Sequence, residues 1–366
     1  MDSGLLLAVV IATALGFGLS NGALDVPTFL SPLISTRSVS PRLLVVGAAV
    51  LNFAGAFLTL EVAVTLSERI FDPMAIEGSE GLEVVLAALA GALAWTLVTS
   101  SLGLPPSSSH ALIGGLAGSF IAAGGLGGIE IGSLLLLALV PAILAPSIAF
   151  LLGGLMISSL YRAFARARPG PTGRRFRLAQ HFSGGLLAVA HGSNDAQKTM
   201  GVILLALIAD GSIAQDSGTP SWVIVTAALA IAAGTVVGAR RVPGRPLPRL
   251  MKMDPAEGFV SQVSSALTIL AASLAGFPLS TTQVMNGGVI GSGLYRGRSA
   301  RRWGLARTVV RAWILTFPAT AVLGGLAFAL SSLVGGGLVG GLAIVVVTVG
   351  AVVPLIGRLR SEPRAH

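Results

Sequence analysis

Apolar residues run along this chain in blocks long enough to cross a lipid bilayer, separated by short polar or basic stretches. A transmembrane helix needs about 20 mostly apolar residues, because the hydrocarbon core is about 30 Å thick. The predicted membrane segments cover residues 4–23, 43–66, 84–104, 110–124, 133–161, 181–208, 222–238, 255–275, 283–294, 312–331 and 338–357. We therefore predict an all-α polytopic membrane protein with about 10–12 membrane segments.

The two halves of the chain repeat one another. The segment GALD (22–25) aligns with GSND (192–195) at an offset of 170 residues, and LPPSSSHALIGG (104–115) aligns with FPLSTTQVMNGG (277–288) at an offset of 173. Two landmarks in the same order with nearly the same spacing indicate an internal repeat.

The repeat and one interruption of the apolar pattern define the organisation of the chain. Residues 162–180 are basic, contain Pro and Gly, and lack an apolar helical stripe, which is typical of a linker. The predicted parts are a first repeat (1–161), a basic cytoplasmic linker (162–180), a second repeat (181–336), and an extra membrane helix with a cytoplasmic tail (337–366).

Composition supports the membrane class. Hydrophobic residues make up 53% of the 366 positions and charged residues 11%, whereas a soluble domain typically carries about 25% charged residues. The 48 glycines, spread along the apolar blocks, allow helix backbones to approach closely in lipid. Cysteine is absent from the sequence, which excludes disulfides and thiolate metal sites.

The net charge of +9 comes from basic clusters in the short loops, which indicates membrane topology rather than nucleic-acid binding. Excess Lys and Arg mark cytoplasmic loops. The clusters comprise Arg162, Arg166, Arg168, Arg174, Arg175 and Arg177; Arg240, Arg241, Arg245, Arg249 and Lys252; Arg296, Arg298, Arg301, Arg302, Arg307 and Arg311; and Arg358, Arg360 and Arg364.

The charge distribution predicts opposite orientations for the two halves. Arg37 and Arg42 place the loop after the first segment inside, and the acidic residues between 68 and 83 then lie outside. The first half therefore starts outside, whereas the second half starts inside after the linker. We predict inverted-topology repeats in a cell membrane, with the N-terminus outside and the linker and C-terminus cytoplasmic. Many secondary transporters have this construction, with a site at the midplane where broken helices meet.

Two aspartates occupy equivalent places in the repeats. Asp25 and Asp195 each lie within or beside an apolar span. An ionisable group costs about 2.5–3.5 kcal/mol or more at the bilayer centre, so it is kept there mainly for function. The structural alternative is that one aspartate caps a helix at an interface. A symmetric pair favours the functional interpretation.

Two hydroxyl clusters are also paired, each after a proline and before a Gly-rich apolar run. Proline disfavours helix just before it, and Ser and Thr are good N-caps. Each cluster therefore predicts a broken, re-entrant helix whose N-terminus offers free N–H groups to an anion. The alternative is a capped hairpin without a ligand. The clusters are Ser107, Ser108 and Ser109, and Ser280, Thr281 and Thr282.

These pairs together predict cation-coupled transport of an oxyanion. An anion held by the hydroxyls would be repelled by two nearby carboxylates unless they are protonated or accompanied by cations, and either case gives symport. Lys198 either adds positive charge near Asp195 or extends to an interface. Asn194 and Gln197 are candidate polar ligands. His110 and His191 are candidate proton carriers, although His191 could instead be interfacial.

The sequence resembles the inorganic phosphate transporter (PiT) family. The segment AHGSNDAQKTMGVI (190–203) is similar to the family signature, and GLPPSSSHA (103–111) and GFPLSTTQV (276–284) are similar to its paired Ser/Thr motifs. The resemblance implies a homodimer that takes up inorganic phosphate with Na⁺ or H⁺. By position, it assigns Asp25, Asn194 and Asp195 to the substrate and coupling-ion sites, and both hydroxyl clusters to the oxyanion.

The chain departs from the family pattern at several positions. Leu24 and Thr28 stand where the first-half motif usually has Asn, and Gln283 stands where the second Ser/Thr motif usually has His. Asn52 and Gln262 replace membrane acids that some relatives carry. Thr28 and Gln197 are then coupling-ion candidates, and His110, Lys198 and Gln283 are secondary site candidates.

The sequence therefore predicts a phosphate symporter that works by alternating access, with no cofactor, no resident metal and no catalytic residues. A sulfate or related oxyanion permease of the same fold is an alternative, because hydroxyls and helix dipoles suit both ions. A transport-inactive regulatory or channel-like protein is an alternative of another class. A membrane hydrolase is disfavoured, because the histidines at 110, 181, 191 and 366 form no cluster with acids in the sequence.

Overall fold

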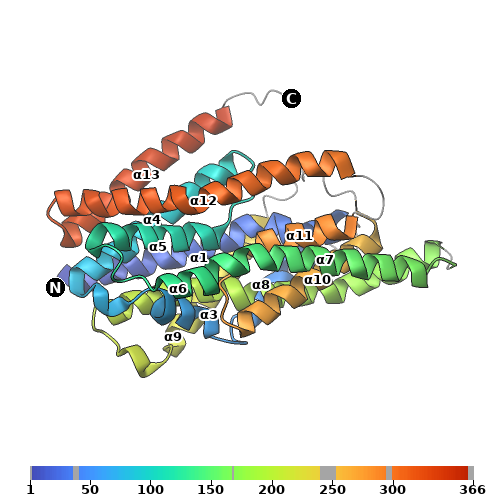
Figure 1. The fold of residues 1–366 in the computed structure, drawn as a ribbon, viewed down its shortest axis with the longest axis horizontal. Coiled ribbons are helices and arrows are strands. Elements are labelled where there is room, and N and C mark those ends of the chain that lie inside the picture. The colour runs from blue at the N-terminus through green and yellow to red at the C-terminus, as the bar shows by residue number, and fades with distance from the viewer. Residues whose placement is uncertain (1, 36–40, 167–168, 240–252, 294–298, 362–366) are drawn as a thin grey trace.

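The computed structural model describes residues 2–35, 41–166, 169–239, 253–293 and 299–361, and these are almost entirely helical (Figure 1). Within these ranges, the one β contact is an isolated bridge between Phe71 and Ile129. The prediction of an all-α protein is confirmed. The helices are α1 (Asp2–Ser35), α2 (Pro41–Gly55), α3 (Glu61–Val64), α4 (Gly78–Ser101), α5 (Ser108–Gly124), α6 (Ile131–Ser133), α7 (Val140–Ala163), α8 (Pro169–Ala209), α9 (Ser221–Ala239), α10 (Pro255–Leu274), α11 (Thr281–Gly293), α12 (Ser299–Leu333) and α13 (Gly337–Ser361).

Six helices in the described ranges are long and apolar enough to cross a membrane. They cover Ser3–Val26, Gly78–Ser101, Ile131–Ala163, Ser221–Ala239, Val310–Leu333 and Gly337–Leu355. Each of the eleven predicted segments coincides with helical structure. The prediction of one continuous helix over 43–66 is wrong, however, because α2 ends at Gly55 and α3 begins at Glu61.

The basic segment 162–180, which the sequence predicts to be a linker, is mostly helical in its described residues. Helix α7 ends at Ala163 and α8 begins at Pro169. The ring of Phe176 in α8 packs on Phe164 and Phe259, with ring centroids 5.5 Å and 5.9 Å apart. These contacts hold the start of α8 against the neighbouring segments, while Arg174, Arg175 and Arg177 remain exposed.

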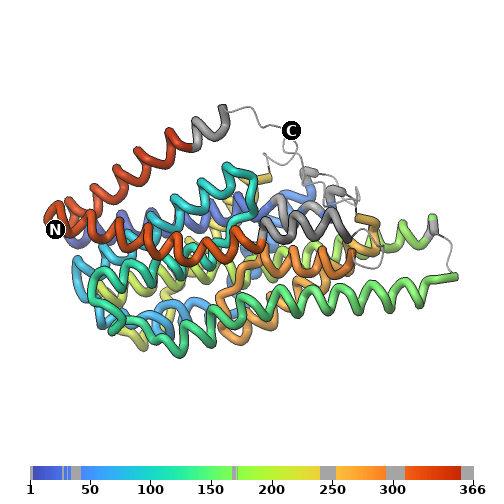
Figure 2. The backbone as a smooth tube through the Cα atoms, turned by 45° about the horizontal axis from the view of Figure 1, so that its top comes forward, coloured from blue at the N-terminus to red at the C-terminus, as the bar shows by residue number. Residues whose placement is uncertain are grey.

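The two halves run in opposite directions. Figure 1 shows α1 starting at the end marked N, whereas α8 starts at the opposite end of the long axis. The hairpin of α4 and α5 and the hairpin of α10 and α11 likewise enter from opposite ends, and their tips lie near the middle (Figure 2). This is the arrangement that inverted repeats produce.

The second helix of each hairpin packs against a long helix of the other half. Helix α5 packs against α12, and its counterpart α11 packs against α7. Glycines make these crossings close: a Cβ at Gly118 would lie 1.8 Å from the carbonyl oxygen of Ala321, and a Cβ at Gly291 would lie 2.0 Å from that of Phe150. The two glycines are 173 residues apart, the offset of the hairpin repeat. The repeat is therefore present in the packing as well as in the sequence.

Candidate functional site

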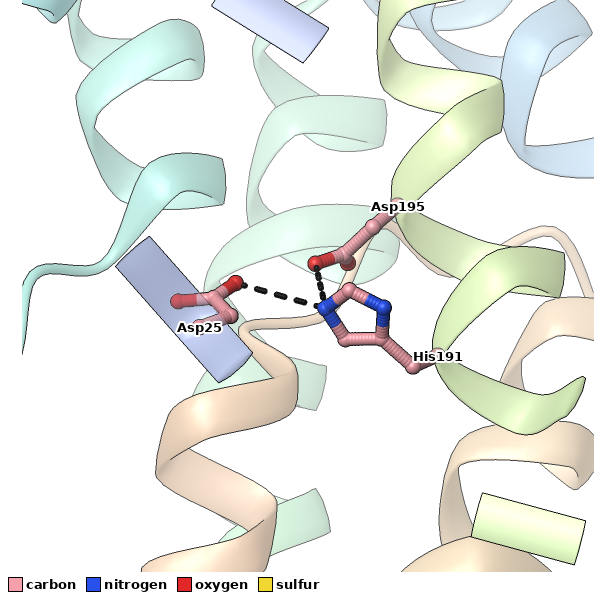
Figure 3. Close-up of side chains that lie close together, drawn as sticks. All are labelled: Asp25, His191 and Asp195. Carbon is pink, nitrogen blue, oxygen red and sulfur yellow. Dashed lines mark ion pairs between the residues drawn. The ribbon is translucent and has the colours of Figure 1, made fainter. Parts of the chain in front are cut away.

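The carboxylates of Asp25 and Asp195 both approach the same ring nitrogen of His191 (Figure 3). The His191 Nε2 atom lies 3.1 Å from Asp195 Oδ2 and 3.5 Å from Asp25 Oδ2. All three side chains are buried, and His191 is only 1% exposed. The expectation that no histidine clusters with acidic residues was therefore wrong.

Helix geometry explains part of this cluster. His191, Asp195 and Lys198 are spaced i, i+4 and i+7 along α8, so they share one face of the helix. Asp25 lies well inside α1, which runs from Asp2 to Ser35. Its alternative role as a helix N-cap is therefore wrong, and the side chain instead meets His191 from the opposite half of the protein.

The hydroxyl clusters lie at the tips of the two hairpins, as predicted. Ser107 is the N-cap of α5 and accepts a hydrogen bond from the His110 N–H at 3.4 Å. Helix α11 begins at Thr281. In both hairpins a glycine with φ of +79°, Gly103 or Gly276, turns the chain after the first helix. These glycines again differ by 173 residues, so the breaks are equivalent.

The two tips bond directly to one another. Ser109 Oγ donates to the Leu279 carbonyl at 2.5 Å, and Thr282 Oγ1 donates to the Pro106 carbonyl at 3.0 Å. Both residue pairs are related by the offset of 173, so the pseudo-twofold axis passes between the tips. Two helix N-termini, with their partial positive charge, thus lie beside one another in the protein interior.

The second-half aspartate is held by donors from three elements. Asp195 Oδ2 accepts from Thr281 Oγ1 at 3.0 Å and from Asn21 Nδ2 at 3.2 Å, while Asp195 Oδ1 lies 2.6 Å from Lys198 Nζ. Asn21 was not predicted as a site residue. Its sequence signal is the offset of 170, which makes it the counterpart of His191.

Lys198 lies inside the cluster. Its side chain has no exposed surface, so its alternative position at a membrane interface is wrong. Its ammonium donates to Ser109 Oγ at 2.8 Å, to Ser108 Oγ at 3.2 Å and to the Leu279 carbonyl at 3.3 Å. The lysine therefore links Asp195 to both hairpin tips.

The amide side chains of Asn194 and Gln197 make hydrogen bonds to backbone groups of neighbouring segments. Asn194 Nδ2 donates to Ser273 Oγ and to the Phe277 carbonyl, both at 3.0 Å, and Asn194 Oδ1 accepts from the Leu279 N–H at 3.0 Å. Gln197 Oε1 accepts from the Val62 N–H at 2.9 Å, at the start of α3. Asn194 thus positions the second hairpin tip, and Gln197 covers the helix break of the first half.

The remaining candidates lie around this centre. His110 Nδ1 lies 3.0 Å from Gln283 Nε2, and these two residues are also counterparts at an offset of 173. Ser280 Oγ lies 3.0 Å from Thr282 Oγ1. The side chain of Thr28 lies outside the described part of the structure.

Two polar substitutions noted in the sequence have distinct surroundings. Asn52 Oδ1 lies 3.0 Å from His191 Nδ1, and Asn52 Nδ2 donates to Thr235 Oγ1 at 2.9 Å. Asn52 therefore orients the imidazole from behind. Gln262 instead accepts from Ser183 Oγ at 2.8 Å, in the contact between α8 and α10.

The cluster combines groups for an anion with groups for a cation. Hydroxyls, helix N-termini and an ammonium suit an oxyanion. Asp25, His191 and Asp195 each offer a ligand atom, all within 4.8 Å of one another, and could hold a metal ion. The Lys198 ammonium, 2.6 Å from Asp195, would repel such an ion.

Comparison with known proteins identifies relatives over most of the chain. The sequence profile of the phosphate transporter family matches residues 21–175 and 165–324, one match in each half. A probable low-affinity inorganic phosphate transporter of Mycobacterium tuberculosis (strain ATCC 25618 / H37Rv) is 39% identical over 95% of this chain and 83% of the relative. Proteins with the same description from Rhizobium meliloti and Bacillus subtilis are 39% and 35% identical, each over 90% of this chain and 97% and 98% of the relatives.

A solved structure has the same fold. The structure titled the sodium-dependent phosphate transporter superposes with a TM-score of 0.82 and covers 90% of this chain and 99% of its own. The sequence identity is 20%, so this similarity concerns the fold alone.

Proposed function

The chain belongs to the phosphate transporter family, and we propose that it is a secondary active transporter that carries inorganic phosphate across the cell membrane together with Na⁺ or H⁺. It is a multi-pass membrane protein and not an enzyme. The relatives named above are described as phosphate transporters, and their similarity extends through both halves of the site.

One observation carries the proposal: two helix N-termini and their hydroxyls lie beside a buried pair of carboxylates. Ser108 and Ser109 from one tip and Thr281 from the other are within one hydrogen bond of Lys198 or Asp195. In the proposed bound state the hydroxyls, the free N–H groups of α5 and α11, and the ammonium hold the phosphate oxygens. A protonated phosphate also donates to a carboxylate.

The charges of the cluster give the coupling. Asp25 and Asp195 contribute two negative charges, and Lys198 contributes one positive charge. With a neutral His191, a phosphate anion would join a cluster that already carries a net negative charge. A cation bound near Asp25, or a proton on the Asp25–His191 pair, removes this repulsion. Phosphate and its coupling cation therefore bind together.

In this proposal, transport occurs by relative movement of the two inverted halves. The site lies where elements of both halves meet, so rocking one half against the other would expose it alternately to either side. We place the two repeats at 1–161 and 181–336, the N-terminus outside, and the linker and C-terminus in the cytoplasm. We expect a homodimer.

Radiolabelled phosphate uptake into proteoliposomes tests this function. Imposed Na⁺ or H⁺ gradients identify the coupling cation, and excess unlabelled sulfate tests the substrate. The expected result is uptake that one of the two gradients drives and that sulfate leaves unchanged. Uptake blocked by sulfate would assign the site to a different oxyanion, and no uptake under either gradient would contradict transport altogether.

A further inference from the structure

The Lys198 ammonium is surrounded by the oxygen ligands that a small monovalent cation takes. Four oxygens lie within 3.3 Å of Nζ: one carboxylate oxygen of Asp195, the hydroxyls of Ser108 and Ser109, and the carbonyl of Leu279. Backbone carbonyl oxygens of unwound helix segments coordinate coupling cations in inverted-repeat transporters, and the Leu279 carbonyl lies in the non-helical segment before α11. The side chain is completely buried, so the ammonium has no alternative partner in water.

The pseudo-twofold relation shows that only one half carries this ammonium. Asp195 and Lys198 correspond to Asp25 and Thr28 at the offset of 170. The hydroxyls around Lys198 also have counterparts at the other tip, as the reciprocal bonds of Ser109 and Thr282 demonstrate. Each half thus provides a carboxylate and a hairpin tip, but the second half alone provides its own cation.

We propose that Lys198 is a tethered cation that takes the place of a mobile coupling cation at Asp195. The carrier then needs a mobile cation or proton only on the side of Asp25, and the charge carried per phosphate is reduced by one relative to a site in which both halves bind mobile cations. Lys198 is in this sense a residue that determines coupling. The inference rests on the proposed transport function.

Two other roles for Lys198 make different predictions. If Lys198 only stabilises the fold, no added ion should restore transport to a variant that lacks it. If Lys198 only binds the anion, its loss should lower phosphate affinity whatever cation is present. A tethered cation, in contrast, can be replaced by a free one once the side chain is removed.

The test compares two substitutions in proteoliposomes. Lys198→Ala removes the charge and opens space beside Asp195, whereas the matched control Lys198→Met removes the charge but fills the space. Under the gradient that drives the wild type, with choline as the only other external cation, both variants should take up phosphate at least about tenfold more slowly than the wild type. Sodium or methylammonium should restore uptake to Lys198→Ala by several-fold and leave Lys198→Met inactive. Normal uptake by Lys198→Ala in choline, or no recovery with either cation, would overturn the proposal.

A second measurement needs no phosphate. Sodium should raise the Tm of detergent-purified Lys198→Ala by a few degrees relative to choline, and by more than it raises the Tm of the wild type or Lys198→Met, because a ligand of the folded state stabilises it. Equal shifts in all three proteins would overturn the tethered cation. If the wild type carries no phosphate, the proposed function fails, and this assay still decides the role of Lys198.

Folding failure of the alanine variant is also informative. Lys198→Asn, which keeps a polar atom in the cluster, is then tested in the same way with the same expected results. Recovery of folded protein in sodium but not in choline would support the proposal. Absence of folded protein for both variants in every medium would make Lys198 a structural residue and reject it.

Discussion

Replacing Gly192 with alanine should push two helices apart behind the site. Gly192 follows His191 in α8, and a Cβ built on it lies 2.0 Å from the carbonyl oxygen of Asn52 in α2. An ordinary contact begins at 3.4 Å, so the helices must separate by about 1.4 Å here. The hydrogen bond between Asn52 and His191, 3.0 Å long, would then exceed hydrogen-bonding distance.

The expected cost follows from these contacts. Overpacking against backbone costs about 1–3 kcal/mol, and a buried polar group that loses its partner costs about 1–3 kcal/mol. The helix propensity of alanine returns at most about 1 kcal/mol. The free energy of unfolding should therefore fall by roughly 1–5 kcal/mol, and phosphate uptake should fall because the imidazole is no longer held.

Gly16→Ala is the matched control. Gly16 lies in α1, the counterpart of α8, and a Cβ built on it would meet no atom within 4 Å. This variant should be neutral or slightly stabilised. Chemical or thermal unfolding in detergent measures both variants, and uptake in proteoliposomes measures the site. If Gly192→Ala is as stable and as active as Gly16→Ala, the close approach of α2 and α8 is refuted.

Three further predictions concern buried polar groups. Asp195→Asn and Lys198→Met should each destabilise the protein by about 3–5 kcal/mol because the partner charge stays buried, and the double variant should recover much of this loss; additive losses in unfolding experiments would contradict the pair. Asn194→Ala should lower phosphate uptake at least about tenfold by releasing the second hairpin tip, and unchanged uptake would contradict its role. Glu83 accepts a hydrogen bond from the Gly337 N–H at the start of α13, so Glu83→Gln should speed hydrogen exchange in α13 by several-fold while phosphate uptake is retained; unchanged exchange would contradict this anchor.

The sequence predicted the features that depend on local chemistry and on the repeat. Proline followed by hydroxyl residues located both hairpin tips, because these residues favour a break and an N-cap wherever they occur. The equivalent positions of Asp25 and Asp195 in the two repeats identified the two carboxylates of the buried cluster. The sequence also shows that His191 precedes Asp195 by one helical turn, which places both side chains on one face of a helix. It does not show that Asp25, from the other half, contacts the same imidazole.

The break between α2 and α3 could not be predicted, because it depends on a tertiary partner. Residues 43–66 read as one apolar block without proline. In the structure, Gln197 from the other half accepts hydrogen bonds from the N–H groups of Val62 and Ala63, at 2.9 Å and 3.3 Å. The backbone groups freed by the break are thus satisfied by a residue 135 positions away from Val62.

The most direct test of the site is phosphate accumulation by the wild type, Asp25→Asn and Asp195→Asn in matched proteoliposomes, each protein first checked by size-exclusion chromatography. Under an inward gradient of the coupling cation, the wild type should concentrate phosphate several-fold above the external level. Both variants should at most equilibrate it, because Asp25→Asn removes the carboxylate that binds the coupling cation or proton, and Asp195→Asn removes the carboxylate that holds the Lys198 ammonium. Accumulation by either folded variant at the wild-type level would contradict the central role of the aspartate pair.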